Sequence, residues 1–230
     1  PTLTENTENN TISMGNPDLK PYLTDNFEFS VEKYFEPVGL LSAGVFLKEI
    51  SNYFRTFSTT IPTSGLDGNG QYAGYKLSTT QNIGSARIRG IELSYQQQFS
   101  FLPGVFKGLG AFANFTYLEA QGNFGTTVST TRLGNLSPRS GNGGINFRYR
   151  GLDARFLANW TDQKYKSTVA GIDVYNEERL MFDVKLQYTI NRRYDVFLDI
   201  SNITDEPPRT DVALNNLKFF KTNQGVGFVA

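Results

Sequence analysis

The chain has 230 residues, which is enough for one β domain or for part of a larger one. Its 22 Lys and Arg residues balance 22 Asp and Glu residues, so net charge gives no argument for nucleic acid or for an acidic substrate. Cys and His are absent, which excludes disulfides, thiol nucleophiles, Ser-His-Asp triads and zinc sites built on His or thiolate from this chain.

The composition favours strands over helices. The chain contains 19 Phe, 12 Tyr and 22 Gly, and these residues suit strands and turns. The longest nearly apolar run, over residues 38–47, falls well short of the roughly 18 apolar residues of a transmembrane helix. A transmembrane barrel is not excluded, because its strands alternate lipid-facing apolar residues with polar residues of the lumen.

In chain order, residues 1–25 are polar and rich in turn formers, which predicts a loop. Alternating apolar residues predict strands over 26–35 and 40–54, joined by a short turn at 36–38. A long loop rich in Thr, Gly and Asp follows over 55–74. The next strand, over 75–99, is expected to bend or bulge at 82–84, because Gly inside a strand often marks such an irregularity.

The second half of the chain continues the pattern, and no segment has a helical period. Strands are predicted over 108–121, in a segment that ends at 145–149, and over 154–161, 180–190, 195–201 and 218–230. The segment 180–190 is the clearest, because one face carries Leu180, Phe182, Val184, Leu186, Tyr188 and Ile190. Since side chains alternate along a strand, each of the roughly nine strands has one apolar and one polar face.

Short and long connections alternate along the chain. Short ones lie near 36–38, 100–107, 150–153 and 190–194, and long ones near 55–74, 122–134, 166–178 and 204–217. Outer-membrane barrels have short periplasmic turns and long extracellular loops, and their strands need about 9–11 residues. We therefore predict an all-β, antiparallel up-and-down transmembrane barrel. The alternative is a soluble β-sandwich whose two apolar faces bury each other.

Five stretches of the chain carry a family resemblance. They are NPDLKP (16–21), DNFEFSVE (25–32), ARIRGIEL (86–93), SPR (137–139) and DISNITD (199–205). In this order and spacing they resemble the C-terminal part of the barrel of TonB-dependent outer-membrane receptors. Two positions depart from the family pattern: Tyr22 stands where Glu is usual, and Ser30 stands where Gly is usual.

The resemblance implies a 22-stranded barrel with a plugged lumen. Residues 1–230 would be one partial barrel domain of about nine C-terminal strands, without the plug domain and the N-terminal strands. No signal peptide, plug or TonB box is recognisable, and the chain ends on Ala230 where the family usually ends on an aromatic residue. We therefore expect an incomplete piece of a receptor.

The same resemblance implies a transporter rather than an enzyme, without a cofactor. Such receptors sit in the outer membrane of Gram-negative bacteria and import scarce nutrients of the siderophore-iron, cobalamin or oligosaccharide class. The expected partners are outer-membrane lipid, the receptor's own plug domain and missing strands, the TonB complex through the absent N-terminal region, and a small-molecule ligand, but no nucleic acid. Another outer-membrane barrel (a porin or an adhesin-like barrel) is the alternative function, ahead of a soluble binding module.

Candidate site residues are few, and neither catalytic nor metal-binding residues are predicted. Tyr72 and Tyr75 lie beside a long loop expected on the outer side, where they could grip a sugar or a siderophore; loop packing or an interface girdle explains them equally well. Arg148, Arg150 and Arg155 gather near a short turn. They could contact an anionic ligand or the plug, but ordinary solvated lumen charge is the favoured interpretation.

Two carboxylates are also expected to face the lumen. Glu92 and Asp183 both fall on polar strand faces, and a neighbouring pair of carboxylates could perform acid–base chemistry. Nothing in the sequence makes them neighbours, so plain lining of the lumen is the favoured interpretation.

Overall fold

The computed structural model describes residues 3–82, 84–123, 133–169, 172–212 and 227–229. In these residues the regular structure is β-strand throughout, apart from one short 3-10 helix at Gly104–Gly108. Contacts divide the chain into two compact units, one of residues 1–26, 48–87 and 121–131, and one of residues 27–47, 88–120 and 132–230. None of the described residues belongs to a helix long and apolar enough to cross a membrane.

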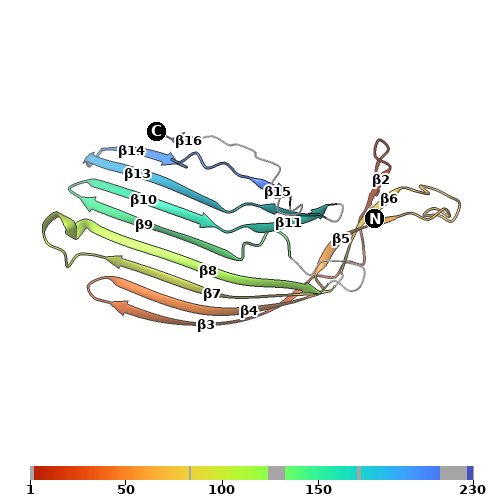
Figure 1. The fold of residues 1–230 in the computed structure, drawn as a ribbon, viewed down its shortest axis with the longest axis horizontal. Helices are drawn as coiled ribbons and strands as arrows, with labels where there is room; N and C mark the ends of the chain where they lie inside the picture. Colours follow the sequence, from red (N-terminus) through yellow and green to blue (C-terminus); the bar gives the residue numbers. More distant parts are fainter. Residues whose placement is uncertain (1–2, 83, 124–132, 170–171, 213–226, 230) are drawn as a thin grey trace. The chain divides into compact units, whose positions relative to one another are not determined.

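The largest sheet has nine strands in the order β16-β14-β13-β10-β9-β8-β7-β4-β3, and this order is open, with β3 and β16 at its edges (Figure 1). The order of strands in this sheet is their order along the chain, although strands of the two smaller sheets lie between β4 and β7, between β10 and β13 and between β14 and β16. The pairs from β8 to β16 are antiparallel. The strands are β3 (Leu23–Phe35), β4 (Gly39–Ser51), β7 (Ser85–Gln98), β8 (Leu109–Asn123), β9 (Arg139–Tyr149), β10 (Leu152–Thr161), β13 (Arg179–Asn191), β14 (Tyr194–Ser201) and β16 (Gly227–Val229).

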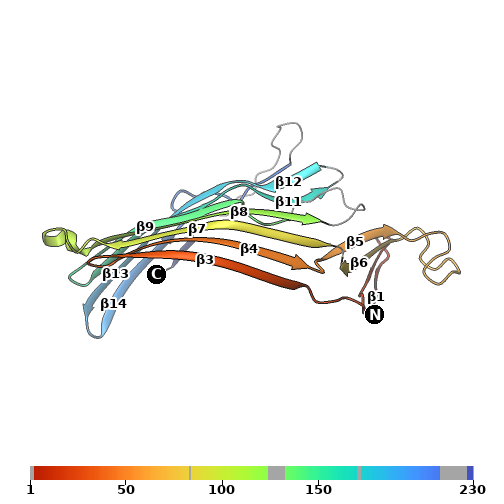
Figure 2. The same cartoon turned by 90° about the horizontal axis from the view of Figure 1, so that it is seen from below.

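This sheet confirms the predicted up-and-down pattern. Most of the predicted strands agree with it within a few residues, although β9 begins at Arg139, earlier than the segment recognised from the sequence. The last predicted strand, over 218–230, lies largely outside the described residues, of which only Gly227–Val229 form β16. Figure 2 shows the same strands from another side, where the sheet is bent rather than flat.

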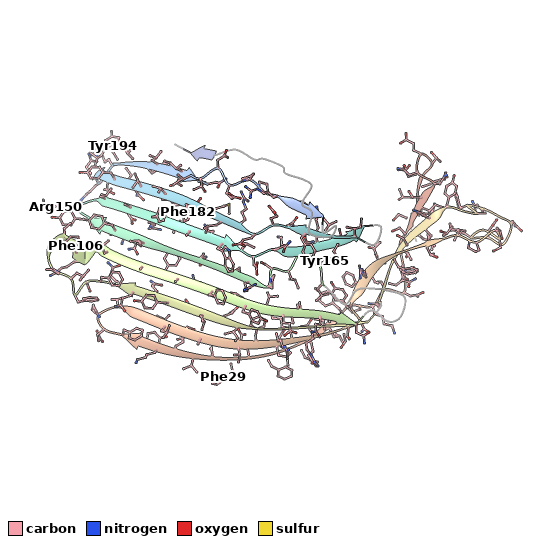
Figure 3. The ribbon with its side chains drawn as sticks, viewed as in Figure 1. Phe29, Phe106, Arg150, Tyr165, Phe182 and Tyr194 are labelled. Atoms are coloured by element: carbon pink, nitrogen blue, oxygen red, sulfur yellow. The ribbon has the colours of Figure 1, made fainter. Side chains whose placement is uncertain are left out.

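The short connections all belong to the second compact unit and lie at one end of its strands, near the labelled Phe106, Arg150 and Tyr194 (Figure 3). The hairpin between β9 and β10 has a two-residue turn, in which Arg150 has φ 46° and Gly151 has φ 86°. Two positive φ angles in succession are typical of the turn that matches the twist of a hairpin, and Gly adopts them without steric cost.

The long connections contain strands of their own, which corrects the prediction of loops there. The segment predicted as a loop over 166–178 includes most of β11 (Lys164–Val169) and all of β12 (Ile172–Asn176). With β15 (Thr210–Val212), these strands form a three-stranded sheet. Most of the connection predicted over 122–134 lies outside the described residues.

Residues 1–25 are likewise not a plain loop. They contain β1 (Leu3–Asn6), β2 (Thr11–Met14) and the start of β3, and β2 pairs in parallel with β6 (Lys76–Asn82). With β5 (Phe54–Thr60), these strands form the four-stranded sheet β1-β2-β6-β5. The pairing partner of β2 is more than 60 residues away in sequence, so the local pattern alone could not reveal the strand.

The predicted irregularity at 82–84 is confirmed. β6 ends at Asn82 and β7 begins at Ser85, and the two strands belong to different sheets. The Asn82 side chain fixes the break, because its Nδ2 donates hydrogen bonds to the carbonyl oxygens of Lys20 (2.8 Å) and Asn52 (2.7 Å). The predicted strand over 40–54 also ends early, at Ser51, because Asn52 adopts φ 56°.

Candidate functional site

The register of the nine-stranded sheet aligns residues of one kind into rows that cross several strands. On one face, here called the outer face, one such row is Ala111, Ile145, Phe156, Val184 and Ile200. The next outer row toward the short turns is Leu109, Phe147, Ala154, Leu186 and Leu198. Every residue of these two rows is apolar. The apolar and polar residues that alternate along each strand therefore line up as separate apolar and polar rows across the sheet.

Much of the outer face is exposed although it is apolar. Ile145 retains 55% of its accessible surface, Phe156 44% and Val196 58%. Toward the long connections it carries the stacked rings of Phe115 and Trp160, whose centroids are 6.5 Å apart. The indole Nε1 of Trp160 donates a hydrogen bond to Glu178, so this ring has an apolar body and a polar contact, as aromatic side chains do at membrane–water interfaces.

The opposite, inner face is charged near the short turns. The carboxylate of Asp153 accepts hydrogen bonds from the guanidinium groups of Arg148 (2.6 Å) and Arg155 (3.0 Å). These two arginines also line a cavity of about 590 Å³. Lys185 pairs with Asp199 at 3.2 Å. The structure therefore brings two of the three predicted arginines together, around a carboxylate that balances part of their charge.

The third arginine lies apart from them. Arg150 occupies the β9–β10 turn, and its guanidinium carbon is 5.1 Å from the centre of the Tyr149 ring. The two carboxylates expected to face a lumen are not neighbours either, because Glu92 lies on β7 and Asp183 on β13, with β8, β9 and β10 between them. Asp183 instead accepts hydrogen bonds from Asn159 and from the backbone N–H of Asn202. The inner face thus offers no paired carboxylates for acid–base catalysis at these positions.

Two further rows of the inner face are uncharged where they cross β8, β9 and β10. The sequence analysis did not predict them. In one, Thr116, Ser140 and Thr161 stand in register, and in the other Asn114, Asn142 and Asn159 do so. The six residues line a cavity of about 250 Å³. Alternation places most of them on polar strand faces, but only the register shows that like residues stand side by side.

The two tyrosines predicted as ligand contacts lie in the first compact unit, in the loop of residues 61–75. This loop closes on itself, since the N–H of Ile61 donates to the carbonyl of Tyr75 (2.8 Å) and the N–H of Gly74 donates to the carbonyl of Ile61 (3.0 Å). The rings of Tyr72 and Tyr75 are 5.6 Å apart and tilted by 55°. Both are half-buried, and Tyr72 adopts φ 60°, which is uncommon outside glycine.

The tip of the same loop is organised by Asp67. Its Oδ1 accepts hydrogen bonds from the backbone N–H groups of Asn69 (2.9 Å) and Gln71 (3.1 Å). These bonds favour the ionised form and hold the pKa of Asp67 below its usual value. Within the part of the chain that the structure describes, no group of three or more carboxylates is arranged to hold a metal ion.

Comparison with known proteins gives the family. The profile of the family "TonB dependent receptor-like, beta-barrel" matches residues 1–203. Among the curated proteins, no sequence matches this chain.

Solved structures give the same fold. A mutant of the ferric enterobactin receptor PfeA from Pseudomonas aeruginosa matches with a TM-score of 0.64 and 16% identity, over 86% of this chain and 28% of that chain. The outer membrane transporter YddB from Escherichia coli matches with a TM-score of 0.66 and 15% identity, over 96% of this chain and 33% of that one. The ferric yersiniabactin uptake receptor FyuA from Yersinia pestis matches with a TM-score of 0.61 and 15% identity, over 90% and 29%.

The chain thus spans a third or less of the length of each of these three proteins. At identities of 15–16% the likeness concerns the fold, which is that of a piece of a receptor barrel. The profile match extends over most of the sequence and agrees with the up-and-down sheet and its alternating connections. This chain belongs to the TonB-dependent receptor-like β-barrel family.

Proposed function

We propose that this chain is the C-terminal barrel portion of an outer-membrane receptor that binds a scarce nutrient and imports it with energy supplied by the TonB complex. The nutrient belongs to the siderophore-iron, cobalamin or oligosaccharide class. The family match supports this proposal, because its members are receptors and transporters of the outer membrane of Gram-negative bacteria and not enzymes.

The observation that carries the proposal is the alternation of whole rows across β8 to β14. Outer rows such as Ala111–Ile145–Phe156–Val184–Ile200 are apolar and half-buried or exposed, whereas the inner rows contain the Arg148–Asp153–Arg155 cluster and the neutral side chains. A water-soluble surface rarely leaves so large an apolar area uncovered. Lipid on one side and a polar lumen on the other account for both faces.

Within this function the proposed partners are the lipid of the outer membrane, the plug domain inside the lumen, the remaining barrel strands and the TonB complex. The barrel strands would continue the sheet beyond its edge strands β3 and β16. We assign Tyr72 and Tyr75 as ligand contacts, because their tilted rings are held in a loop whose ends are fixed by backbone hydrogen bonds. Aromatic rings in a pre-organised loop bind ligands at a low cost in conformational entropy.

The test is energy-dependent uptake by cells that carry the intact receptor. Candidate nutrients from each class are supplied at limiting concentration to wild-type cells, to cells without the receptor and to cells without TonB. We expect uptake of one nutrient to be lost in both deletion strains. Uptake that needs the receptor but not TonB would indicate a diffusion porin and contradict the proposal, as would unchanged uptake of every nutrient without the receptor.

A further inference from the structure

We propose that the two uncharged inner rows on β8, β9 and β10 form a binding surface for a neutral, hydroxyl-rich ligand of the oligosaccharide type. This surface is called the neutral patch and consists of Asn114, Asn142, Asn159, Thr116, Ser140 and Thr161. The inference rests on the proposed uptake function and narrows its ligand class.

The register gives the neutral patch its form. Adjacent strands lie about 4.8 Å apart, and successive inner rows are two residues, or about 7 Å, apart along each strand. Three amides therefore form one line across the sheet, and three hydroxyls form a parallel line above it. The patch lies over a hollow of about 250 Å³ and has the extent of a short oligosaccharide segment.

Several hydrogen-bonding groups of the patch are not used within the protein. Ser94 donates to the Oδ1 of Asn114 (2.7 Å), and the Nδ2 of Asn114 donates to the Oδ1 of Asn142 (2.7 Å). Within the described part of the chain, the Nδ2 of Asn142 and the hydroxyls of the three-hydroxyl row have no protein partner. Amides and hydroxyls both donate and accept hydrogen bonds, as sugar hydroxyls do.

The charges around the patch disfavour an anionic chelate. On the same inner face Arg148 and Arg155 share the Asp153 carboxylate and Lys185 pairs with Asp199, all in rows closer to the short turns. A ligand with several negative charges would lose hydration at the neutral patch without gaining a cationic partner there.

The two charged side chains that border the patch on β13 are also engaged within the protein. Asp183 adds a negative charge beside Asn159, and their side chains are 3.2 Å apart. Arg179 continues the hydroxyl row, and its Nη2 donates to the carbonyl of Glu206 (3.0 Å). Its Nε has no hydrogen-bond partner but is buried, so it does not face a ligand on the patch. Neither residue turns the patch into an anion site.

An apolar row completes the surface. Next to the amide row, toward the short turns, Phe112, Gly144 and Leu157 stand in register. Phe112 lies close over the backbone of Gly144, where an added Cβ would come 2.9 Å from its ring. Sugar rings have apolar C–H faces and polar rims, so a line of amides beside an aromatic ring matches both parts of such a ligand.

Adjacent positions on one strand provide matched variants for the test. On β8, Asn114→Leu places a leucine in the neutral patch, and the control Ala113→Leu places a leucine on the outer face of the same strand. On β10, Asn159→Leu and Ala158→Leu form a second such pair. Each variant of the intact receptor is purified in detergent and its folded fraction is measured by heat-modifiability. Binding per folded molecule is then measured against an array of neutral oligosaccharides, with ferric enterobactin and ferric citrate as anionic probes.

We expect saturable binding of a neutral oligosaccharide and not of the ferric chelates. Each Asn→Leu variant should weaken it about 2- to 10-fold, the value of one lost hydrogen bond, while the Ala→Leu variants should leave it unchanged. The inference is overturned if no neutral oligosaccharide binds, or if a ferric chelate binds equally well to all variants; TonB-dependent uptake of that chelate would then leave the proposed function standing.

A further outcome would also overturn the inference. If the Asn→Leu variants lower the folded fraction but leave oligosaccharide binding per folded molecule unchanged, the neutral patch contacts the rest of the receptor and not the ligand. Loss of TonB dependence, measured separately, would contradict the proposed function itself.

Discussion

The two compact units differ in how completely they bury their best-covered and their outer-face apolar side chains. In the unit that contains the four-stranded sheet, Ile12 and Ile61 are almost completely buried, at 0% and 2% exposure. In the unit that contains most of the nine-stranded sheet, outer-face residues such as Ile145 and Phe156 remain exposed. The first unit thus covers some of its apolar side chains completely, whereas the second leaves much of its outer face uncovered, and we propose that this face contacts lipid.

The largest expected effect concerns the side of the outer membrane on which the 61–75 loop and the β13–β14 turn are accessible. A cysteine that replaces Asn69, at the tip of the 61–75 loop, should react completely with a membrane-impermeant maleimide on whole cells, and a cysteine that replaces Arg193, in the β13–β14 turn, should not react. This is because long connections face outward and short turns face the periplasm. The chain contains no natural Cys to interfere. Labelling of position 193 alone would reverse the proposed topology.

A core substitution tests the water-facing unit. Ile12→Ala should cost about 2–5 kcal/mol of local stability, because it leaves a cavity around a fully buried side chain. Limited proteolysis of intact cells should then cut the first unit faster than in the wild type. Ser13→Ala, one position along on the exposed side of β2, is the control and should not change the cleavage rate. Equal cleavage of both variants would mean that Ile12 supports no core.

A charge on the outer face tests the lipid-facing region. Val184→Arg should lower the stability of the intact receptor by about 2–4 kcal/mol if Val184 lies near the middle of the membrane. Lys185→Arg, on the inner face, keeps the charge that pairs with Asp199 and should leave stability unchanged. The readout is the folded, heat-modifiable fraction in detergent. A detergent-free monomer that unfolds cooperatively would contradict a lipid-facing surface and favour the β-sandwich.

The smallest expected effect concerns the loop tip. The pKa of Asp67 is lowered in the folded loop, so its contribution to loop stability is complete above the usual value of 3.8 and is lost as the pH falls through the lowered value. The rate of backbone amide exchange at Asn69 and Gln71, corrected for its intrinsic pH dependence, should therefore rise as the pH falls from 3.8 through the lowered pKa. Asp67→Asn should remove this pH dependence. A wild-type exchange profile in the variant would show that the carboxylate does not organise the loop.

Much of the strand pattern of the nine-stranded sheet could be predicted from the sequence, but little of the candidate site could. Val184 and Lys185 could be assigned to opposite faces because alternation is a local property of extended backbone. The sharing of Asp153 by Arg148 and Arg155 had no such signal, since it depends on which strand positions stand opposite each other. Tyr72 and Tyr75 were predicted from their aromatic side chains and their place at a long connection, and their role as ligand contacts stays a prediction.

The sequence by itself determined that the chain is all-β, with strands that are apolar on one face and short and long connections that alternate. These features follow from side-chain period and turn chemistry, which act within a few residues. Only the tertiary structure decided the rows of the neutral patch, the pairing of β2 with β6 and the break at Asn82. The reason is that register is set by contacts between distant segments, and a slip of one residue would move every side chain to the other face.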